Sequence, residues 1–189
     1  MPTHSGLADS ELHNPKGFAG ASNSTTLTKN SSGSLAWVTH FIDAIGEMKI
    51  QNNSTAFTPG AADITSFKHL ANTGWVAGEY SNTVVSADDV NDNIATTNAG
   101  TYFVTFWCVI STAAATGVQF AFKYALDGTV DTNRKLLVQK NSSGADMITV
   151  SATGYVTTTA AQELSIYMAS SATTTLTITD GGLTVQRVK

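Results

Sequence analysis

The chain of 189 residues is poor in charge and in cysteine. Charged side chains make up 13% of it, about half of the roughly 25% found in average soluble domains. Cys108 is the single cysteine of this sequence, which excludes a disulfide within it. The formal net charge is −4, and the Lys and Arg residues are scattered, so the basic footprint of a nucleic-acid-binding protein is missing. We therefore expect no nucleic-acid partner.

Metal, cofactor and membrane signatures are also missing. The histidines are far apart and do not show the close spacing of zinc ligands. No apolar run approaches the roughly 18 residues that a membrane-spanning helix needs, and no basic segment followed by an apolar stretch opens the chain. We expect no metal, no cofactor and no membrane association, and we expect synthesis in a cytoplasm.

Catalytic patterns are equally scarce. The sequence has no Gly-x-Ser-x-Gly elbow, and His69 is the one histidine in its strand-rich part. The acidic stretch 88–93 lacks the central glycine and distal glutamate of a helix-loop-helix calcium site, which favours an ordinary polar turn. We expect a binding or structural protein, not an enzyme.

The N-terminal part is rich in Ser, Thr, Asn and Gly. Over residues 19–36 the apolar positions are too sparse to offset the roughly 1–2 kcal/mol per residue that ordering the backbone costs. We predict an extended N-terminal arm over residues 1–37 that is ordered only against a neighbour. Trp37 packs either on its own domain or on a neighbour's. The other expected anchors of the arm are Leu12, Pro15, Phe18 and Leu27.

Beyond the arm, the pattern is that of an all-β protein. Residues 38–50 are predicted to be a neck and a first strand, with Phe41, Ile42 and Ile45 suited to a helical turn and Met48 and Ile50 alternating as in a strand. Residues 51–189 carry short apolar alternations between frequent turn signals, which predict an antiparallel sandwich or barrel. The turn signals include Asn98-Ala99-Gly100, Asp127-Gly128, Ser143-Gly144 and Asp180-Gly181-Gly182.

The stretch 100–110 breaks the alternation, because both of its faces are apolar. One face carries Tyr102 and every second residue to Ile110, and the other carries Phe103, Trp107 and Val109. A two-sheet sandwich covers only the inner face of a strand. The outer face lies either beneath a loop of the same chain or against another subunit, and we favour the second.

The stretch 88–110 resembles part of a known family. Its acidic turn, followed by Asn98-Ala99-Gly100-Thr101-Tyr102, is similar to the alanine-glycine-x-tyrosine step of jelly-roll trimers such as the complement globular head and tumour necrosis factor. The resemblance implies an antiparallel jelly-roll β-sandwich and a homotrimer. It places Tyr102 and its neighbours Phe103, Trp107 and Val109 at the trimer contact.

The arm resembles a second group of proteins. His13-Asn14-Pro15-Lys16-Gly17, a polar tract and a glycine-containing stretch that ends at Trp37 are similar to the N-terminal segment of many tailed-bacteriophage virion proteins. The resemblance implies docking on a major capsid protein or another virion protein, with His13 bonded there instead of simply solvated. The implied docking residues are Leu12, His13, Asn14, Pro15, Lys16, Gly17, Phe18, Leu27 and Trp37.

Together, the two resemblances lead us to expect a homotrimeric capsid decoration protein, a cement protein or head fibre, at the virion surface. One alternative is a tail fibre or receptor-binding tip that recognises a host glycan, with Trp75 and Tyr80 as stacking platforms. A second alternative is a tumour-necrosis-factor-like surface ligand.

Overall fold

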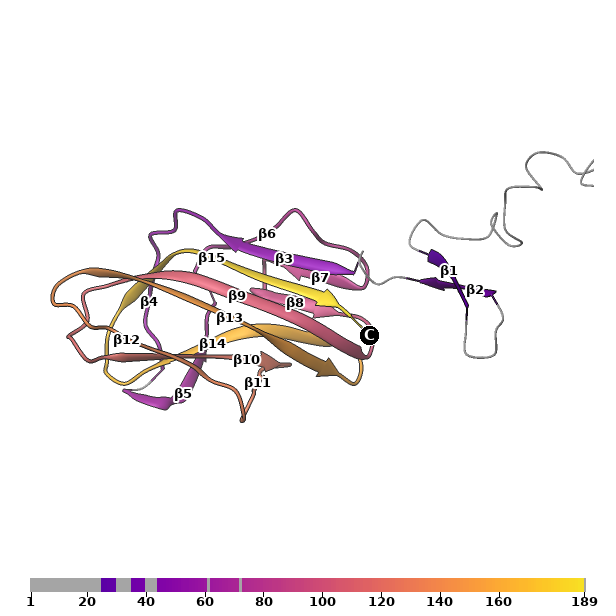
Figure 1. Cartoon of the computed structure of the whole chain (residues 1–189). Helices are drawn as coiled ribbons and strands as arrows, with labels where there is room; N and C mark the ends of the chain where they lie inside the picture. The colour runs from indigo at the N-terminus through magenta and orange to yellow at the C-terminus, as the bar shows by residue number, and fades with distance from the viewer. Residues whose placement is uncertain (1–24, 30–34, 40–43, 61, 72, 189) are drawn as a thin grey trace, which may run out of the picture. The chain divides into compact units, whose positions relative to one another are not determined.

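The chain forms two separate compact units that contain strands and turns. In the computed structural model the described residues are 25–29, 35–39, 44–60, 62–71 and 73–188 (Figure 1). The units are Met1–Asp43 and Ala44–Lys189. The second unit, called the body below, therefore begins inside the segment that the sequence predicts to be a neck.

The first unit contains a β-hairpin. Strands β1 (Thr25–Lys29) and β2 (Leu35–Thr39) pair antiparallel, with Leu27 opposite Trp37. The backbone of both strands is extended, and β-branched threonines suit a paired strand even in a polar sequence. The division into an arm over residues 1–37 and a display domain stays a prediction. The predicted docking residues 12–18 lie outside the described residues.

One sheet of the body, called the β9 sheet, has the strand order β13-β9-β15-β3-β6, and β4 pairs with β15. All of its pairs are antiparallel. The longest ladder joins β9 and β13 along their whole length. The strands are β3 (Ile45–Ile50), β4 (Ala56–Phe57), β6 (Trp75–Ala77), β9 (Gly100–Thr112), β13 (Asp146–Thr158) and β15 (Leu176–Arg187).

The second sheet, called the β10 sheet, has the order β11-β10-β14-β8-β7, and β12 pairs with β10. Strand β5 (Asp63–His69) packs beside β14. The two sheets form the predicted antiparallel β-sandwich (Figure 1). The strands are β7 (Val85–Asp88), β8 (Asn93–Thr96), β10 (Gln119–Leu126), β11 (Thr129–Val130), β12 (Leu136–Gln139) and β14 (Gln162–Ser170).

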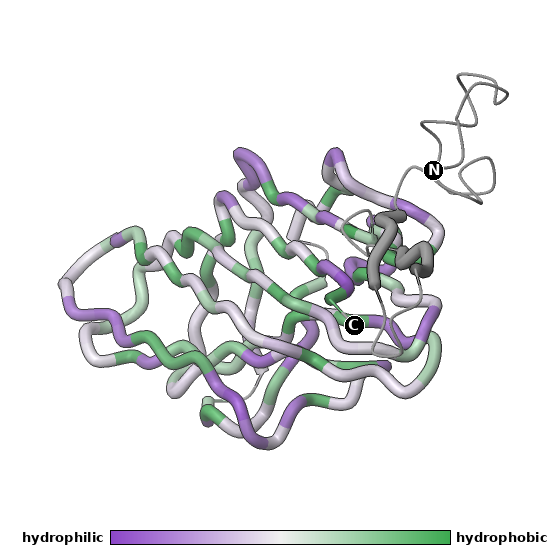
Figure 2. The backbone as a smooth tube through the Cα atoms, turned by 45° about the vertical axis from the view of Figure 1, so that its right-hand side comes forward, coloured by the Kyte–Doolittle hydropathy of each residue, from purple (hydrophilic) through white to green (hydrophobic). Residues whose placement is uncertain are grey.

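The hydrophobic core lies between the sheets. Alternate residues of β9 point into it and are buried, and Phe106 meets Phe122 of the opposite sheet with ring centroids 5.5 Å apart. Hydrophobic residues recur along the strands, and many connecting loops are hydrophilic (Figure 2). This alternation is the period-2 pattern that predicts strands. The inward residues of β9 are Tyr102, Val104, Phe106, Cys108 and Ile110.

One predicted turn is wrong. Asp180-Gly181-Gly182 lies inside β15, where the pairing with β9 shifts register between Ile178 and Asp180. Gly182 is opposite Trp107, and a Cβ at Gly182 would lie 2.5 Å from the indole Nε1. Gly182 therefore does not form a turn; it allows the ring of Trp107 to approach the backbone closely, which is a recognised use of glycine within strands.

The predicted helical turn at Ile45 is also wrong. It opens strand β3 instead of a helical turn, because Gly46, Met48 and Ile50 alternate into the core. A Cβ at Gly46 would lie 2.8 Å from Val85 Cγ1 and 3.1 Å from Ile94 Cγ2. A residue without a side chain is therefore needed where β3 packs on β7 and β8.

We predict that Gly46→Ala lowers the free energy of unfolding by about 1–3 kcal/mol, because the added methyl overpacks the core. The matched control is Gly154→Ala in β13, where the new Cβ would meet only Arg134 Nη1 at 3.7 Å. The control should stay within about 0.5 kcal/mol of the unchanged protein. Urea denaturation measures both, and equal effects of the two changes would contradict the packing argument.

Candidate functional site

The outer face of the β9 sheet is the candidate site, since it carries large apolar side chains outside the core. Trp107 is 41% exposed, and Phe103 and Val109 are half-buried. All three come from β9, which is paired on both sides by β13 and β15. Its side chains therefore stand on a rigid surface in the middle of the sheet.

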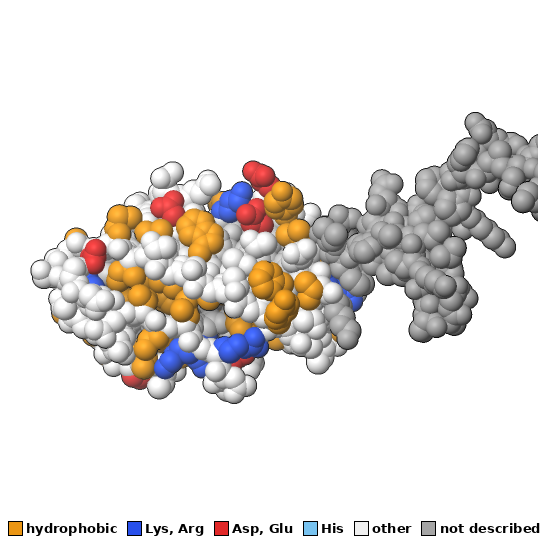
Figure 3. All heavy atoms as spheres, viewed as in Figure 1, with side chains coloured by type: hydrophobic (Ala, Val, Ile, Leu, Met, Phe, Trp, Pro, Cys, Tyr) orange, Lys and Arg blue, Asp and Glu red, His pale blue; other side chains and the backbone are white. Residues whose placement is uncertain are grey.

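Strand β13 extends this surface. Tyr155 is opposite Phe103 in the ladder, with ring centroids 5.3 Å apart, and Tyr155 is 58% exposed. Hydrophobic side chains gather over the region occupied by β9, β13 and β15 (Figure 3). We call this surface the apolar face, and it consists of Phe103, Trp107, Val109, Met147 and Tyr155.

Charged residues lie on the strands beside β9, where Asp180 of β15 is opposite Val109. Lys49 of β3 lies 3.5 Å from Glu47 and 3.8 Å from Glu79. Such exposed ion pairs contribute little stability. Large apolar side chains with a few charged residues beside them match the anatomy of a protein–protein interface.

Both explanations for the two-faced strand, a loop of the same chain or another subunit, stay predictions. Within the described part of the chain no loop covers Trp107, which keeps 41% of its surface exposed. The predicted contact residues Phe103, Trp107 and Val109 do lie together on one accessible face.

Tyr102 does not lie on this face. Its side chain is 0% exposed, and its hydroxyl donates a hydrogen bond to the Asn98 carbonyl oxygen at 2.7 Å. The prediction that Tyr102 contacts another subunit is wrong, because neighbouring strand residues point to opposite faces and Tyr102 faces the core.

Of the two rings predicted to stack on a glycan, only Tyr80 is accessible. Trp75 is buried, and its indole Nε1 donates to the Leu70 carbonyl oxygen at 2.9 Å, so it cannot stack on a sugar. Tyr80 is exposed. A platform of both rings is therefore excluded.

Cys108, Asp88 and His69, which the sequence offers as possible reactive or metal-binding groups, are each buried or hydrogen-bonded within the fold, or stacked on a neighbouring ring. Burial raises the pKa of the Cys108 thiol to about 12, which keeps it protonated and unreactive. Asp88 accepts hydrogen bonds from the backbone N–H groups of Val90 and Asn91, so stretch 88–93 contains a polar turn between β7 and β8. His69 stacks on Tyr167 with centroids 5.1 Å apart.

The described residues hold no group of three or more His, Cys, Asp or Glu side chains placed to bind a metal ion. Over the same residues there is no helix of the length and apolarity needed to cross a membrane.

Comparison with solved structures identifies the fold. The Eiger TNF from S. frugiperda superposes with a TM-score of 0.52 at 9% sequence identity, over 77% of this chain and 93% of that chain. The body has a tumour-necrosis-factor-like jelly-roll fold. Murine APRIL at pH 5.0 aligns with a TM-score of 0.48 at 9% identity, over 76% of this chain and 98% of that chain. No protein-family profile matches the chain, and no curated protein matches it.

We predict that Tyr102→Phe lowers the free energy of unfolding by about 1 kcal/mol, because one buried hydrogen bond is lost. The Asn98 carbonyl keeps a second donor, the Thr158 hydroxyl at 3.1 Å, so it is not left without a partner. Chemical denaturation and light scattering measure stability and mass. A variant of unchanged stability and altered mass would contradict the inward position of Tyr102.

Proposed function

We propose that the chain is a homotrimeric virion protein that decorates a bacteriophage capsid and binds it through the N-terminal arm. The body supplies the subunit contacts and the arm supplies attachment. The protein acts by binding and not by catalysis, at the virion surface.

The apolar face is the main observation that supports a trimer. An aromatic pair, Phe103 and Tyr155, and a third ring, Trp107, lie on a rigid central part of the β9 sheet. Exposed aromatic residues on a well-supported surface are typical interface hot spots, each worth about 2 kcal/mol or more when buried by a partner. The tumour-necrosis-factor-like fold and the Gly100-Thr101-Tyr102 step, which resembles that of jelly-roll trimers, support a threefold assembly.

We predict that the double change Trp107→Glu and Tyr155→Glu converts the trimer into monomers, because two carboxylates would have to be desolvated in each contact. Leu137→Glu is the matched control. Leu137 is an apolar residue of similar exposure, 43%, but it belongs to β12 of the other sheet. Sedimentation velocity at micromolar concentration measures the mass of each variant.

The control should keep the mass of the unchanged protein. A trimer that survives the double change would show that the apolar face is not the subunit contact. Circular dichroism of both variants separates loss of assembly from loss of folding.

Attachment through the arm is supported by the sequence of residues 13–17, which resembles the N-terminal segment of phage virion proteins, and by the boundary between the two units at Asp43 and Ala44. Three arms on one trimer would bind with avidity, since the second and third arms bind at high effective concentration.

We predict that deletion of residues 1–43 leaves a folded trimer that no longer binds phage capsids. The body has its own core, so its thermal unfolding should be little changed. Cosedimentation with capsids measures binding, and the full chain is the positive control. Unchanged capsid binding by the truncated protein would refute attachment through the arm.

The second candidate function is a tumour-necrosis-factor-like surface ligand, which the fold favours. It would use the same trimer and would not need a capsid. Failure of the full chain to bind any capsid, together with an intact trimer, would favour this candidate.

A further inference from the structure

The body contains a pocket at one open edge of the sandwich, separate from the apolar face. It lies between β13 of the β9 sheet and β10 and β14 of the β10 sheet, and residues 133–136 lie across its rim. Its volume is about 420 Å³, within the range of about 300–1,000 Å³ that is typical of small-molecule sites.

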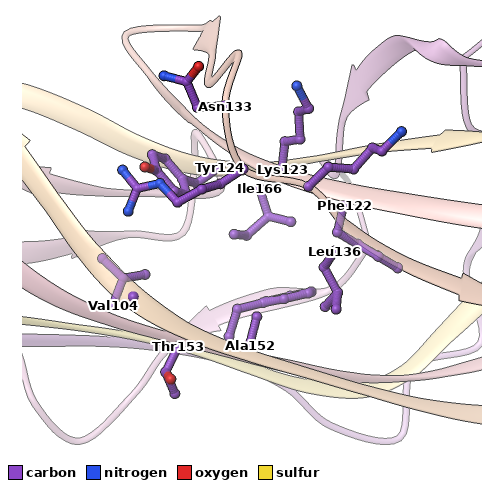
Figure 4. Close-up of a pocket in the computed structure, with 13 residues that line it drawn as sticks. Val104, Phe122, Lys123, Tyr124, Asn133, Leu136, Ala152, Thr153 and Ile166 are labelled. Atoms are coloured by element: carbon purple, nitrogen blue, oxygen red, sulfur yellow. The ribbon is translucent and has the colours of Figure 1, made fainter.

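The walls of the pocket are apolar and come from both sheets (Figure 4). The apolar side chains would surround a hydrocarbon group. Lys123 also lines the pocket, but its Nζ already donates to the Asp131 carbonyl oxygen at 2.6 Å. The wall residues are Val104, Phe106, Phe122, Leu136, Ala152 and Ile166.

The space exists because β13 carries its two smallest inward residues here. Four residues of β13 point toward the core in succession, namely Val150, Ala152, Gly154 and Val156. The two valines are buried, whereas Ala152 and Gly154 between them are partly exposed. Gly154 has neither a positive φ nor a crowded Cβ position, since the nearest atom to a new Cβ is Arg134 Nη1 at 3.7 Å. Neither backbone strain nor close packing requires a glycine at this position, and close approach of a ligand is one of the recognised uses of glycine within strands.

The rim of the pocket carries positive charge on a chain whose net charge is −4. Arg134 reaches from the rim to β13, where its Nη1 donates to the Tyr155 carbonyl oxygen, and its guanidinium lies 4.9 Å from the centroid of the Tyr124 ring. Lys135 also lines the rim, and among the described residues it has no ion-pair partner.

Asp131 holds this arrangement in place. Its carboxylate accepts hydrogen bonds from the Tyr124 hydroxyl at 2.6 Å and from the backbone N–H groups of Asn133 and Arg134 at 2.6 and 2.8 Å. Its contact with the Arg134 side chain is longer, 3.5 Å. Since the guanidinium has five N–H donors, Arg134 can still bind an anion.

We propose that this pocket binds a single-chain fatty acid, with the acyl chain between the sheets and the carboxylate at Arg134 and Lys135. Apolar walls select the chain, and the cationic rim selects an anionic head group over a neutral one. The site shares no residue with the apolar face, and its test measures ligand binding instead of assembly or capsid attachment.

The test is a titration of the full chain with the fluorescent fatty acid cis-parinaric acid, followed by displacement with laurate and with dodecanol. We expect saturable binding and displacement by laurate at lower concentration than by dodecanol. Absence of saturable binding would overturn the proposal.

Two variants locate the site. Gly154→Leu fills the pocket and should weaken cis-parinaric acid binding by about tenfold or more, through loss of the apolar contacts of the chain. The matched control Gln139→Leu adds the same side chain at an exposed position of β12 outside the pocket and should bind as the unchanged protein does. Equal affinities of these two variants would overturn the proposal.

Arg134→Met tests the head-group contact and keeps an aliphatic side chain at the rim. It should weaken laurate binding by about tenfold, the size expected for a charge-assisted hydrogen bond, and leave dodecanol binding unchanged. An equal loss for both ligands, or no loss for laurate, would contradict the proposed role of Arg134 even if Gly154→Leu fails to fold.

Discussion

The body depends on the packing of β9 against the β10 sheet. Alternate residues of this strand from Tyr102 to Ile110 are buried between the sheets, and Phe106 contacts Phe122 across the core. Because side chains alternate along a strand, burying this set leaves Phe103, Trp107 and Val109 on the opposite side. The core thus determines which aromatic residues are available to another molecule.

Much of this could be predicted from the sequence. Alternation in residues 118–126 predicts β10, and the apolar residues on both sides of 100–110 predict an apolar outer face. Asp127 and Gly128 both have positive φ, 49° and 74°, which is why Asp-Gly marks the turn between β10 and β11. Turn residues and the alternation of buried side chains along a strand can therefore be recognised from the sequence alone.

The errors concern which side chains the two packed sheets bury or bring together. The sequence of Gly181 and Gly182 predicts a turn, but both residues lie within β15. Gly182 is opposite Trp107, which is more than 70 residues away in the chain, and leaves room for its ring. The sequence places Trp75 and Tyr102 at surfaces, but both rings lie in the hydrophobic core between the sheets. The pocket was not predicted, because the small size of Ala152 and Gly154 has meaning only beside the opposite sheet.

We propose that a partner subunit covers the outer face of β9, and the mass of the unmodified chain in solution tests this most directly. Sedimentation equilibrium at micromolar concentration should give three times the chain mass of 19.8 kDa. A mass of 19.8 kDa across the concentration range would contradict the claim, because Phe103, Trp107 and Tyr155 would then stay exposed to water.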